Sequence, residues 1–250
     1  MLKISGAERS GQVPHYTWED TGVNGYHLNG TLSSASILQE TVFPLLAGLP
    51  KDALVADFGC GEGRVEQKAP SFKDRTYIFR GFELNSAAVD RFNRTFENGP
   101  DRAEIADLTN LQDGRDRFHA ALFWRVLHSI PKDIHQIVLT QITDTLKSGA
   151  SLHVAALSES DWKREGLEQL GLYIPGQMNE CYPVMKEALE PEGIQSWPLY
   201  FFRTGELARL GEQIGLVVVD QRLIQEESGF KVLRENHPPL SYDYIRFIKQ

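Results

Sequence analysis

Residues Val55 to Arg64 read Val-Ala-Asp-Phe-Gly-Cys-Gly-Glu-Gly-Arg, an apolar run that passes directly into three alternating glycines. The run 53–58 predicts a short buried strand, and the glycines predict a turn at its carboxyl end. Glycine can adopt positive φ angles and lets a ligand approach the backbone closely. In an open α/β sheet such a turn lies at the edge where ligands collect. Taken alone, this glycine pattern fits a ligand site and a plain tight turn equally well.

Outward from this turn, short apolar runs alternate with segments of helical periodicity. We predict strands over 53–58, 76–84, 103–106, 118–124 and 152–157, and helices over 31–49, 63–72, 86–96 and 134–146. Towards the C-terminus, a helix over 204–214, capped by Thr204, precedes strands over 216–223 and 242–248 that could form an antiparallel pair. The alternation predicts an α/β fold with a Rossmann-like, doubly wound seven-stranded sheet whose last strand is antiparallel.

Residues 158–203 interrupt this alternation. They contain prolines at 175, 183, 191 and 198 together with several aromatic residues. We predict that this segment is an insertion after the fifth strand and that it packs over the edge of the sheet.

Composition and charge exclude several classes of protein. The chain has 250 residues, with 26 Lys plus Arg and 34 Asp plus Glu, and a formal net charge of −8. This acidic balance disfavours nucleic acid as a partner, because binding along a phosphate backbone needs clustered Lys and Arg. No stretch approaches the roughly 18 apolar residues of a membrane span, and the N-terminus lacks the apolar core of a signal peptide. We therefore expect a cytoplasmic protein, monomeric or homodimeric, with no membrane partner.

The cysteine count excludes two further classes. Cys60 and Cys181 are too few for a disulfide framework or for a four-ligand zinc site. No cluster of His, Cys and Asp shows the spacing of metal ligands, so we predict no metal.

Three acids at predicted strand ends favour a ligand site over a plain turn. Asp57 precedes the glycines, where its carboxylate could meet an amine. Glu83 lies 20 residues after Gly63, where an acid can accept both hydroxyls of a ribose. Asp107 ends the third strand, where the exocyclic amine of adenine could reach it.

Two nucleotide-binding alternatives fail on spacing. A dinucleotide fold expects Gly-x-Gly-x-x-Gly, and Arg64 stands where the last glycine belongs. A phosphate-binding P-loop requires a Gly-Lys-Ser/Thr sequence, which does not follow this turn. A nicotinamide-dependent oxidoreductase is therefore disfavoured.

At this point the chain resembles the class I S-adenosylmethionine-dependent methyltransferases. Their motifs are matched in order by 57–63 (the glycine-rich motif), Glu83 (the ribose-binding acid), Asp107-Leu108 (the adenine-binding motif), 124–131 (the segment after strand four) and 146–150 (the turn before strand five). The resemblance is close over about 50–157, and 204–250 matches the last helix and two strands of the family. It implies S-adenosyl-L-methionine as cofactor, S-adenosyl-L-homocysteine as product, and a small molecule as methyl acceptor.

The resemblance also implies which residues contact the cofactor. They are expected in the N-terminal segment and at the ends of four strands: Tyr16, Asp57, Gly59, Cys60, Gly61, Glu83, Leu84, Asp107, Leu108, Phe123 and Trp124. Cys60 is interpreted as a small filler of the turn and not as a nucleophile. One departure is that the fourth strand begins Phe118-His119, where the family usually has Phe-Asp. Either the missing acid is dispensable, or catalysis does not use it.

The methyl group of this cofactor is already activated, so the protein mainly has to align the acceptor behind it. A base can assist, and His128, just past the fourth strand, is our catalytic candidate. The alternative is that His128 hydrogen-bonds a backbone carbonyl and packs near the cofactor.

Members of the family often fold the segment before the first strand over the cofactor. We therefore expect 1–50 to form a helical lid on a cofactor-binding domain, 51–250, and the insertion 158–203 to roof the substrate pocket. In this picture Tyr16 touches the methionine end of the cofactor, and the substrate contacts are His15, Tyr26, Trp162, Tyr173 and Tyr200. Aromatic walls predict a planar or apolar acceptor. The alternative is that these rings pack the lid and the core of the cap.

Together these features predict methyl transfer to an oxygen or nitrogen of a small, aromatic or heterocyclic metabolite, in bacterial-type secondary or cofactor metabolism. The rival is a protein that binds S-adenosylmethionine without transferring its methyl, as a regulator or as a catalyst of rearrangement or cyclisation. His119, in place of the usual acid, favours this rival.

Overall fold

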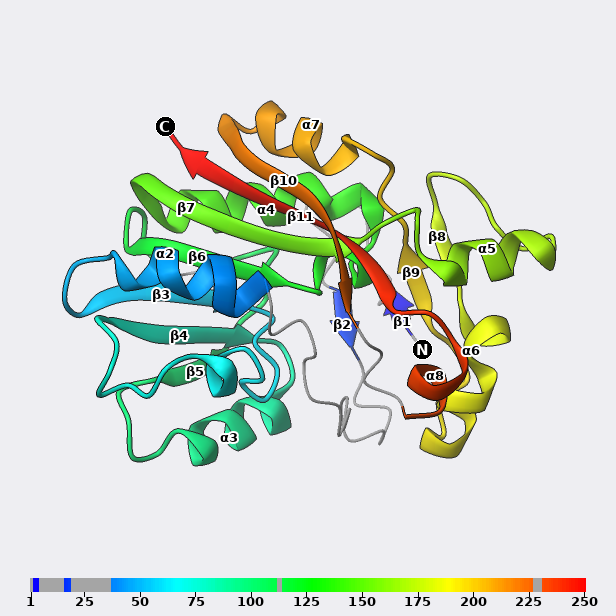
Figure 1. Cartoon of the computed structure of the whole chain (residues 1–250), viewed down its shortest axis with the longest axis horizontal. Helices are drawn as coiled ribbons and strands as arrows, with labels where there is room; N and C mark the ends of the chain where they lie inside the picture. The colour runs from blue at the N-terminus through cyan, green and yellow to red at the C-terminus, as the bar shows by residue number, and fades with distance from the viewer. Residues whose placement is uncertain (1, 5–15, 19–36, 112–113, 227–230) are drawn as a thin grey trace.

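The computed structural model describes residues 2–4, 16–18, 37–111, 114–226 and 231–250, and its centre is a seven-stranded sheet (Figure 1). The strand order across the sheet is β10-β11-β7-β6-β3-β4-β5. The strands are β3 (Ala53–Phe58), β4 (Tyr77–Glu83), β5 (Arg102–Ile105), β6 (Phe118–Trp124), β7 (Leu146–Leu157), β10 (Leu216–Glu226) and β11 (Leu240–Lys249).

The pairing of these strands confirms the predicted sheet. β3 is parallel to β4 and β6, β4 to β5, and β6 to β7, while β11 runs antiparallel to β7 and β10. The chain leaves β3 towards β4 and β5 and later returns to β6 on its other side. The topological switch point therefore lies at the carboxyl end of β3, where open α/β sheets bind ligands.

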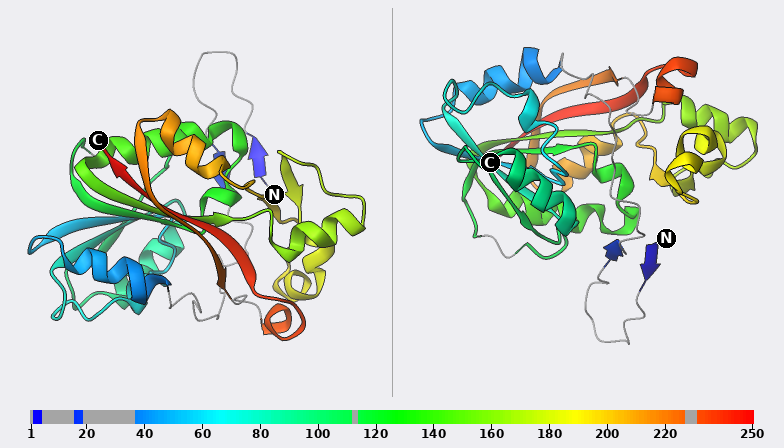
Figure 2. Two further views of the ribbon diagram at one scale, coloured as in Figure 1. Left: turned by 45° about the horizontal axis from the view of Figure 1, so that its top comes forward. Right: turned by 90° about the horizontal axis from the view of Figure 1, so that it is seen from below.

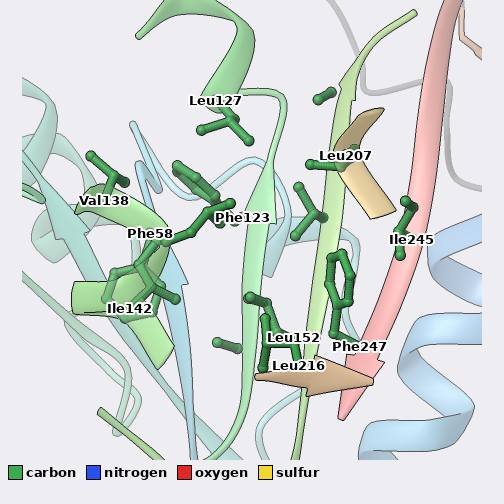
Figure 3. Close-up of a cluster of buried hydrophobic side chains, with 14 of the residues drawn as sticks. Phe58, Phe123, Leu127, Val138, Ile142, Leu152, Leu207, Leu216, Ile245 and Phe247 are labelled. Carbon is green, nitrogen blue, oxygen red and sulfur yellow. The ribbon is translucent and has the colours of Figure 1, made fainter. Parts of the chain in front are cut away.

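Helices cover both faces of the sheet because its strands are apolar on both sides. On one face, α4 (His135–Thr145) and α7 (Glu206–Gln213) cover the largest apolar core, which contains Phe58, Phe123 and Leu152 (Figure 3). On the other face, η1 (Leu38–Val42) and α2 (Phe43–Ala47) cover a second core that contains Val55 and Trp124. Side chains alternate along a strand, so Asp57 points to the same face as Val55.

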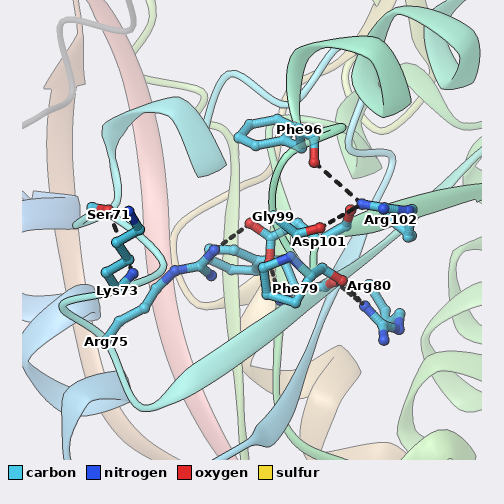
Figure 4. A network of polar contacts seen from close by, with 10 residues as sticks. Ser71, Lys73, Arg75, Phe79, Arg80, Phe96, Gly99, Asp101 and Arg102 are labelled. Atoms are coloured by element: carbon cyan, nitrogen blue, oxygen red, sulfur yellow. Dashed lines mark hydrogen bonds and ion pairs between the residues drawn. The ribbon is translucent and has the colours of Figure 1, made fainter.

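Two smaller features fix β4 and β5. α3 (Ser86–Thr95) begins at Asn85, whose side chain accepts a hydrogen bond from the Ala88 amide at 3.2 Å, and it packs Phe92 on the sheet. Near the amino end of β4, buried Arg75 and Asp101 form an ion pair, and Asp101 also accepts the Phe79 amide at 2.9 Å (Figure 4). This network lies at the amino end of β4, whereas the glycine turn lies at the carboxyl edge of the sheet.

Three sequence predictions need correction. The predicted helix over 63–72 is absent, because Gly63 has a φ of 81° and only the short helix η2 (Glu66–Lys68) follows the turn. Thr204 does not cap α7. The N-cap is Gly205, which makes no side-chain cap, and the Thr204 amide donates to Glu159 at 3.0 Å. β7 begins at Leu146 instead of 152, because that residue pairs with Phe118 of β6. The part of the predicted 31–49 helix before 37 lies outside the described residues.

The insertion forms a cap beyond the carboxyl ends of β6 and β7 (Figure 2). It consists of α5 (Trp162–Gln169), β8 (Met178–Glu180), α6 (Tyr182–Leu189), η5 (Glu190–Glu192) and β9 (Pro198–Tyr200), and α8 (Lys231–Asn236) joins it from the last connection. Buried residues of these elements form a separate apolar cluster with the ends of β7 and β11. Two short N-terminal strands, β1 (Leu2–Ile4) and β2 (Tyr16–Trp18), form an antiparallel pair.

Candidate functional site

The glycine turn, residues 59–63, follows β3 directly at the switch point of the sheet. Gly59, Gly61 and Gly63 have φ angles of 74°, 55° and 81°. Residues with a Cβ atom rarely adopt such left-handed angles. The Gly59 amide donates to the Phe82 carbonyl at 2.7 Å, which ties the turn to the end of β4.

Close packing requires two of these glycines, and the third faces open space. A Cβ on Gly59 would lie 2.4 Å from Cγ2 of Val126, and a Cβ on Gly63 would lie 2.5 Å from Cε2 of Phe96. A Cβ on Gly61 would meet no atom of the described chain within 4 Å. The turn is therefore anchored at both ends and open in the middle, which leaves room for a ligand at Gly61.

Glu83, at the end of β4, places a carboxylate against this open middle. Its Oε2 accepts the Gly61 amide at 3.0 Å, and its Oε1 accepts the Asn85 amide at 3.0 Å. An ionised carboxylate has about four acceptor sites. The half-buried Glu83 therefore has a fixed orientation and can still accept two further donors, such as the vicinal hydroxyls of a ribose.

Asp57 and Glu66 form a buried pair of carboxyl groups next to the turn. Asp57 is 1% exposed and Glu66 4%. The two carboxyl groups act on each other electrostatically, and Oδ2 of Asp57 and both oxygens of Glu66 have no hydrogen-bond partner among the described residues. Burial, reinforced by the charge of Glu83, raises the pKa of Asp57 to about 7. Burial and the charge of Asp57 raise the pKa of Glu66 well above its usual value.

Cys60 fills the space between the turn and the neighbouring strands. Its side chain is buried beside Val89 and Phe92, and a Cβ on Gly81 would lie 2.5 Å from its Sγ. Burial raises the pKa of the Cys60 thiol well above its usual value, and the nearby acids raise it further. A neutral, packed thiol agrees with the interpretation of Cys60 as a filler.

The remaining predicted cofactor contacts lie at the ends of β4, β5 and β6. Leu84, Asp107 and Leu108 are half-buried, and Oδ1 of Asp107 accepts the amide and the hydroxyl of Thr109 at 2.8 and 2.7 Å. Phe123 and Trp124 are 0% and 5% exposed and belong to the two sheet cores. A ligand at this edge can therefore reach the backbone of these two residues but not their rings.

His128 lies in η3 (Leu127–Ser129), just past β6, and is 7% exposed. Its Nδ1 accepts the Leu157 amide at 3.3 Å, and its ring packs on Tyr242. Nδ1 is therefore unprotonated, and the single proton of the neutral ring sits on Nε2. Burial lowers the pKa of His128 well below its usual value, and the nearby Arg125 and Lys163 lower it further.

Buried charged groups that were not predicted from the sequence surround His128. Arg125 has a positive φ of 64° and pairs with Glu226 at 3.2 Å, and its guanidinium lies over the ring of Tyr242. Lys163 and Asp161 form a second buried ion pair at 2.6 Å. No local pattern signals the first pair, because Arg125 follows β6 and Glu226 ends β10. Asp161 and Lys163 are neighbours in sequence, but their burial depends on the packing of the cap.

The predicted substrate rings divide into three groups. Tyr200 is 1% exposed, and its hydroxyl donates to Glu206, so it packs between the cap and α7. Trp162 and Tyr173 are half-buried against the cap core, where Trp162 stacks on His237 with ring centroids 4.1 Å apart. His15 and Tyr26 lie outside the described residues. The backbone of Tyr16 belongs to β2.

One further cavity among the described residues lies away from the glycine turn. A cavity of about 230 Å³ beside α4 and α7 is lined by residues outside the glycine turn: Lys132, His135, Phe202, Glu206, Arg209, Leu210 and Gln213. Within the described ranges, no group of three His, Cys, Asp or Glu residues is placed to hold a metal ion. No helix in this part of the chain has the length and apolarity needed to cross a membrane.

Comparison with known proteins identifies the fold. No protein-family model and no curated protein matches the chain, but many solved structures do. An S-adenosylmethionine-dependent methyltransferase from Methanosarcina mazei matches with a TM-score of 0.65 at 18% identity, over 84% of this chain and 97% of that one. The cyclase SpnF matches with a TM-score of 0.62 at 12% identity, over 86% of this chain and 81% of that one.

A third structure contains both of its ligands. It is the Burkholderia thailandensis 1,6-didemethyltoxoflavin N1-methyltransferase with 1,6-didemethyltoxoflavin and S-adenosylhomocysteine bound. It matches with a TM-score of 0.59 at 18% identity, over 87% of this chain and 79% of that one. These likenesses show that the chain has the fold of the class I S-adenosylmethionine-dependent methyltransferases, as the sequence motifs predict.

Proposed function

We propose that the chain binds S-adenosylmethionine at the glycine turn and transfers its methyl group to an oxygen or nitrogen of a small metabolite. The observation that carries this proposal is the placement of the Glu83 carboxylate on the Gly61 amide, at 3.0 Å, beside the open middle of the turn. This arrangement lies at the switch point of a sheet with the methyltransferase fold. It suits a ligand that presents ribose hydroxyls and carries positive charge.

Each residue at the strand ends is proposed to contact a different part of the cofactor. Glu83 would accept the ribose hydroxyls, and Asp107 and Leu108 would border the adenine. Asp57 would face the methionine end, where acids stabilise positive charge. Gly61 supplies room, while Gly59 and Cys60 shape the turn. When bound, this cofactor supplies an activated sulfonium methyl group.

For His128 the geometry favours a different role from that of a general base. Its Nδ1 already accepts the Leu157 amide, and both burial and nearby cations disfavour the charged ring that a base would become. We propose that its Nε2–H donates a hydrogen bond to the acceptor and orients it. Alignment of an activated methyl group can proceed without a base on the protein.

The acceptor is proposed to lie between the carboxyl edge of the sheet and the cap. The half-buried rings of Trp162 and Tyr173 are the candidates for its wall. Of the expected lid 1–50, residues 38–47 cover the sheet instead, so only the residues before 37, with Tyr16, His15 and Tyr26, are proposed to close over the acceptor. Because the cap core takes up many of its aromatic residues, few remain to contact the acceptor. The two remaining rings, Trp162 and Tyr173, would still suit a small, planar molecule, and the net charge of −8 disfavours nucleic acid.

A labelling experiment tests the proposal. The protein is incubated with methyl-labelled S-adenosylmethionine and a metabolite extract, in parallel with Glu83→Ala. The proposal predicts a labelled small molecule with the wild-type protein and much less of it with the variant. If no labelled product forms although S-adenosylhomocysteine binds, methyl transfer is ruled out and cofactor binding is retained.

A second function is favoured by one comparison, while the residue that suggested it in the sequence, His119, lies away from the glycine turn. The cyclase SpnF shares the fold, and His119 stands where the family usually has an acid. In the structure His119 accepts the Leu54 amide at 3.2 Å and lies 2.8 Å from Nζ of Lys147, so its ring has a packing role at the far end of β6. The alternative is a protein that uses bound S-adenosylmethionine without consuming it, and recovery of unchanged labelled cofactor alongside a transformed metabolite would favour it.

A further inference from the structure

Glu66 adds a second buried carboxyl group that the glycine motif does not contain. It lies in η2, directly after the turn, and its neighbour Val65 packs in the same core as Val55 of β3. Glu66 and Asp57 are both buried and act on each other electrostatically, and Oδ2 of Asp57 and both oxygens of Glu66 have no hydrogen-bond partner among the described residues. Two ionised carboxylates in one buried place repel each other, so the pair is more stable when one of the two groups carries a proton.

The surroundings of the pair favour keeping that proton. Two further acids act on the pair electrostatically and raise its pKa values: Glu83 on β4 and Asp101 before β5. Asp101 is already paired with Arg75, and the thiol of Cys60 is neutral. A buried carboxylate without a counter-charge is unfavourable, so the pair holds a proton at neutral pH.

We infer that Asp57 and Glu66 act as one cation-recognition element: they share a proton in the free protein and release it when a positively charged ligand binds at the glycine turn. The inference rests on the proposed function, because it takes the ligand to be an adenosyl amino acid. It makes Glu66 a residue that determines affinity for the cofactor. It also explains how this turn disfavours nucleotides, because their phosphates would face three acids.

Proton release has a measurable consequence. If one proton leaves per ligand bound, the affinity rises up to tenfold for each pH unit over the range in which the pair is protonated. A ligand that lacks the positive charge gains nothing from ionisation of the pair. Its affinity should therefore be independent of pH.

Isothermal titration calorimetry at pH near 7, in buffers of different ionisation enthalpy, counts the released protons. The probes are S-adenosylhomocysteine, which carries an ammonium group, and methylthioadenosine, which does not. For the wild-type protein we expect roughly half to one proton released with S-adenosylhomocysteine and none with methylthioadenosine. Glu66→Gln should abolish the release, because the glutamine amide can donate to an ionised Asp57.

Glu97→Gln is the matched control, since Glu97 is an exposed glutamate at the end of α3, and it should behave like the wild type. The inference is overturned if the wild-type protein binds S-adenosylhomocysteine without releasing protons, or if Glu66→Gln releases as many as the wild type. If Glu66→Gln does not fold, the inference is tested by the wild-type protein alone: its affinity for S-adenosylhomocysteine should rise with pH, and its affinity for methylthioadenosine should not. Failure of S-adenosylhomocysteine to bind at all would instead refute the proposed function.

Discussion

Replacing Gly61 by alanine, with Gly59→Ala as its matched partner, separates ligand binding from folding. Both glycines have positive φ angles, 55° and 74°, so both alanines incur left-handed strain of about 1–2 kcal/mol. At Gly61 this strain is the whole expected cost, because the new Cβ meets no described atom within 4 Å. At Gly59 the new Cβ would lie 2.4 Å from Val126, and such overpacking adds about 1–3 kcal/mol.

Thermal unfolding and calorimetry measure the two effects. For a chain of this size about 1 kcal/mol lowers Tm by roughly 2–4 °C, so Gly61→Ala should lose roughly 2–8 °C and Gly59→Ala roughly 4–20 °C. Gly61→Ala should nevertheless weaken S-adenosylhomocysteine binding at least tenfold, because its methyl group occupies the proposed ligand space. If Gly61→Ala folds and binds S-adenosylhomocysteine with the affinity of the wild-type protein, the ligand does not lie at Gly61. Equal losses of Tm would contradict the packing argument for Gly59.

Three further predictions concern charged and titrating groups. The free energy of unfolding should fall by up to about 4 kcal/mol between about pH 4 and pH 7, because native Asp57, with its pKa raised to about 7, retains a proton that the unfolded chain releases. Denaturant titrations should show this slope, and Asp57→Asn should reduce it, while buried Glu66 retains its own raised pKa. His128 should remain neutral with its proton on Nε2 at about pH 6, and a long-range ¹⁵N–¹H NMR spectrum showing an imidazolium would contradict this. Asp101→Asn should lower the stability by about 3–5 kcal/mol, because buried Arg75 loses its counter-ion, and an unchanged free energy of unfolding would contradict this.

The sheet could be predicted because each strand carries a local signal. Short apolar runs, bounded by glycine, proline or polar residues, predicted the position of every strand from β3 to β7 within a few residues. The βα alternation predicted that these strands run parallel to one another. The exception is the start of β7, where the segment from Leu146 looks like a turn in sequence. Its strand conformation depends on pairing with Phe118 in a distant part of the chain.

The glycine turn shows where sequence patterns fail. The apolar and polar residues after Gly63 fit a helix, but the left-handed angle of Gly63 and its packing on Phe92 and Phe96 prevent one from starting there. As a result Glu66 points to Asp57 instead of to solvent. In the sequence, the only signal for this pair was an acid three residues after the third glycine. Its burial near Asp57 could not be predicted, because it depends on the absence of the predicted helix.

The surroundings of His128 could not be predicted for a related reason. Its hydrogen bond comes from Leu157 at the end of β7, and its neighbouring charges lie on β6 and in the cap. These long-range contacts determine which nitrogen of the His128 ring is available to bind a ligand. The sequence identified the residue, and the structure was needed to propose a donor in place of a base.

The binding of S-adenosylhomocysteine to the wild-type protein and to Glu83→Ala, with NADH as the competing ligand, tests the central claim most directly. The claim predicts that the wild-type protein binds S-adenosylhomocysteine and not NADH. Glu83→Ala should weaken binding by roughly ten- to 150-fold, equivalent to about 1.5–3 kcal/mol for lost charge-assisted hydrogen bonds. Binding of NADH in preference to S-adenosylhomocysteine, or an affinity for S-adenosylhomocysteine unchanged by Glu83→Ala, would contradict it.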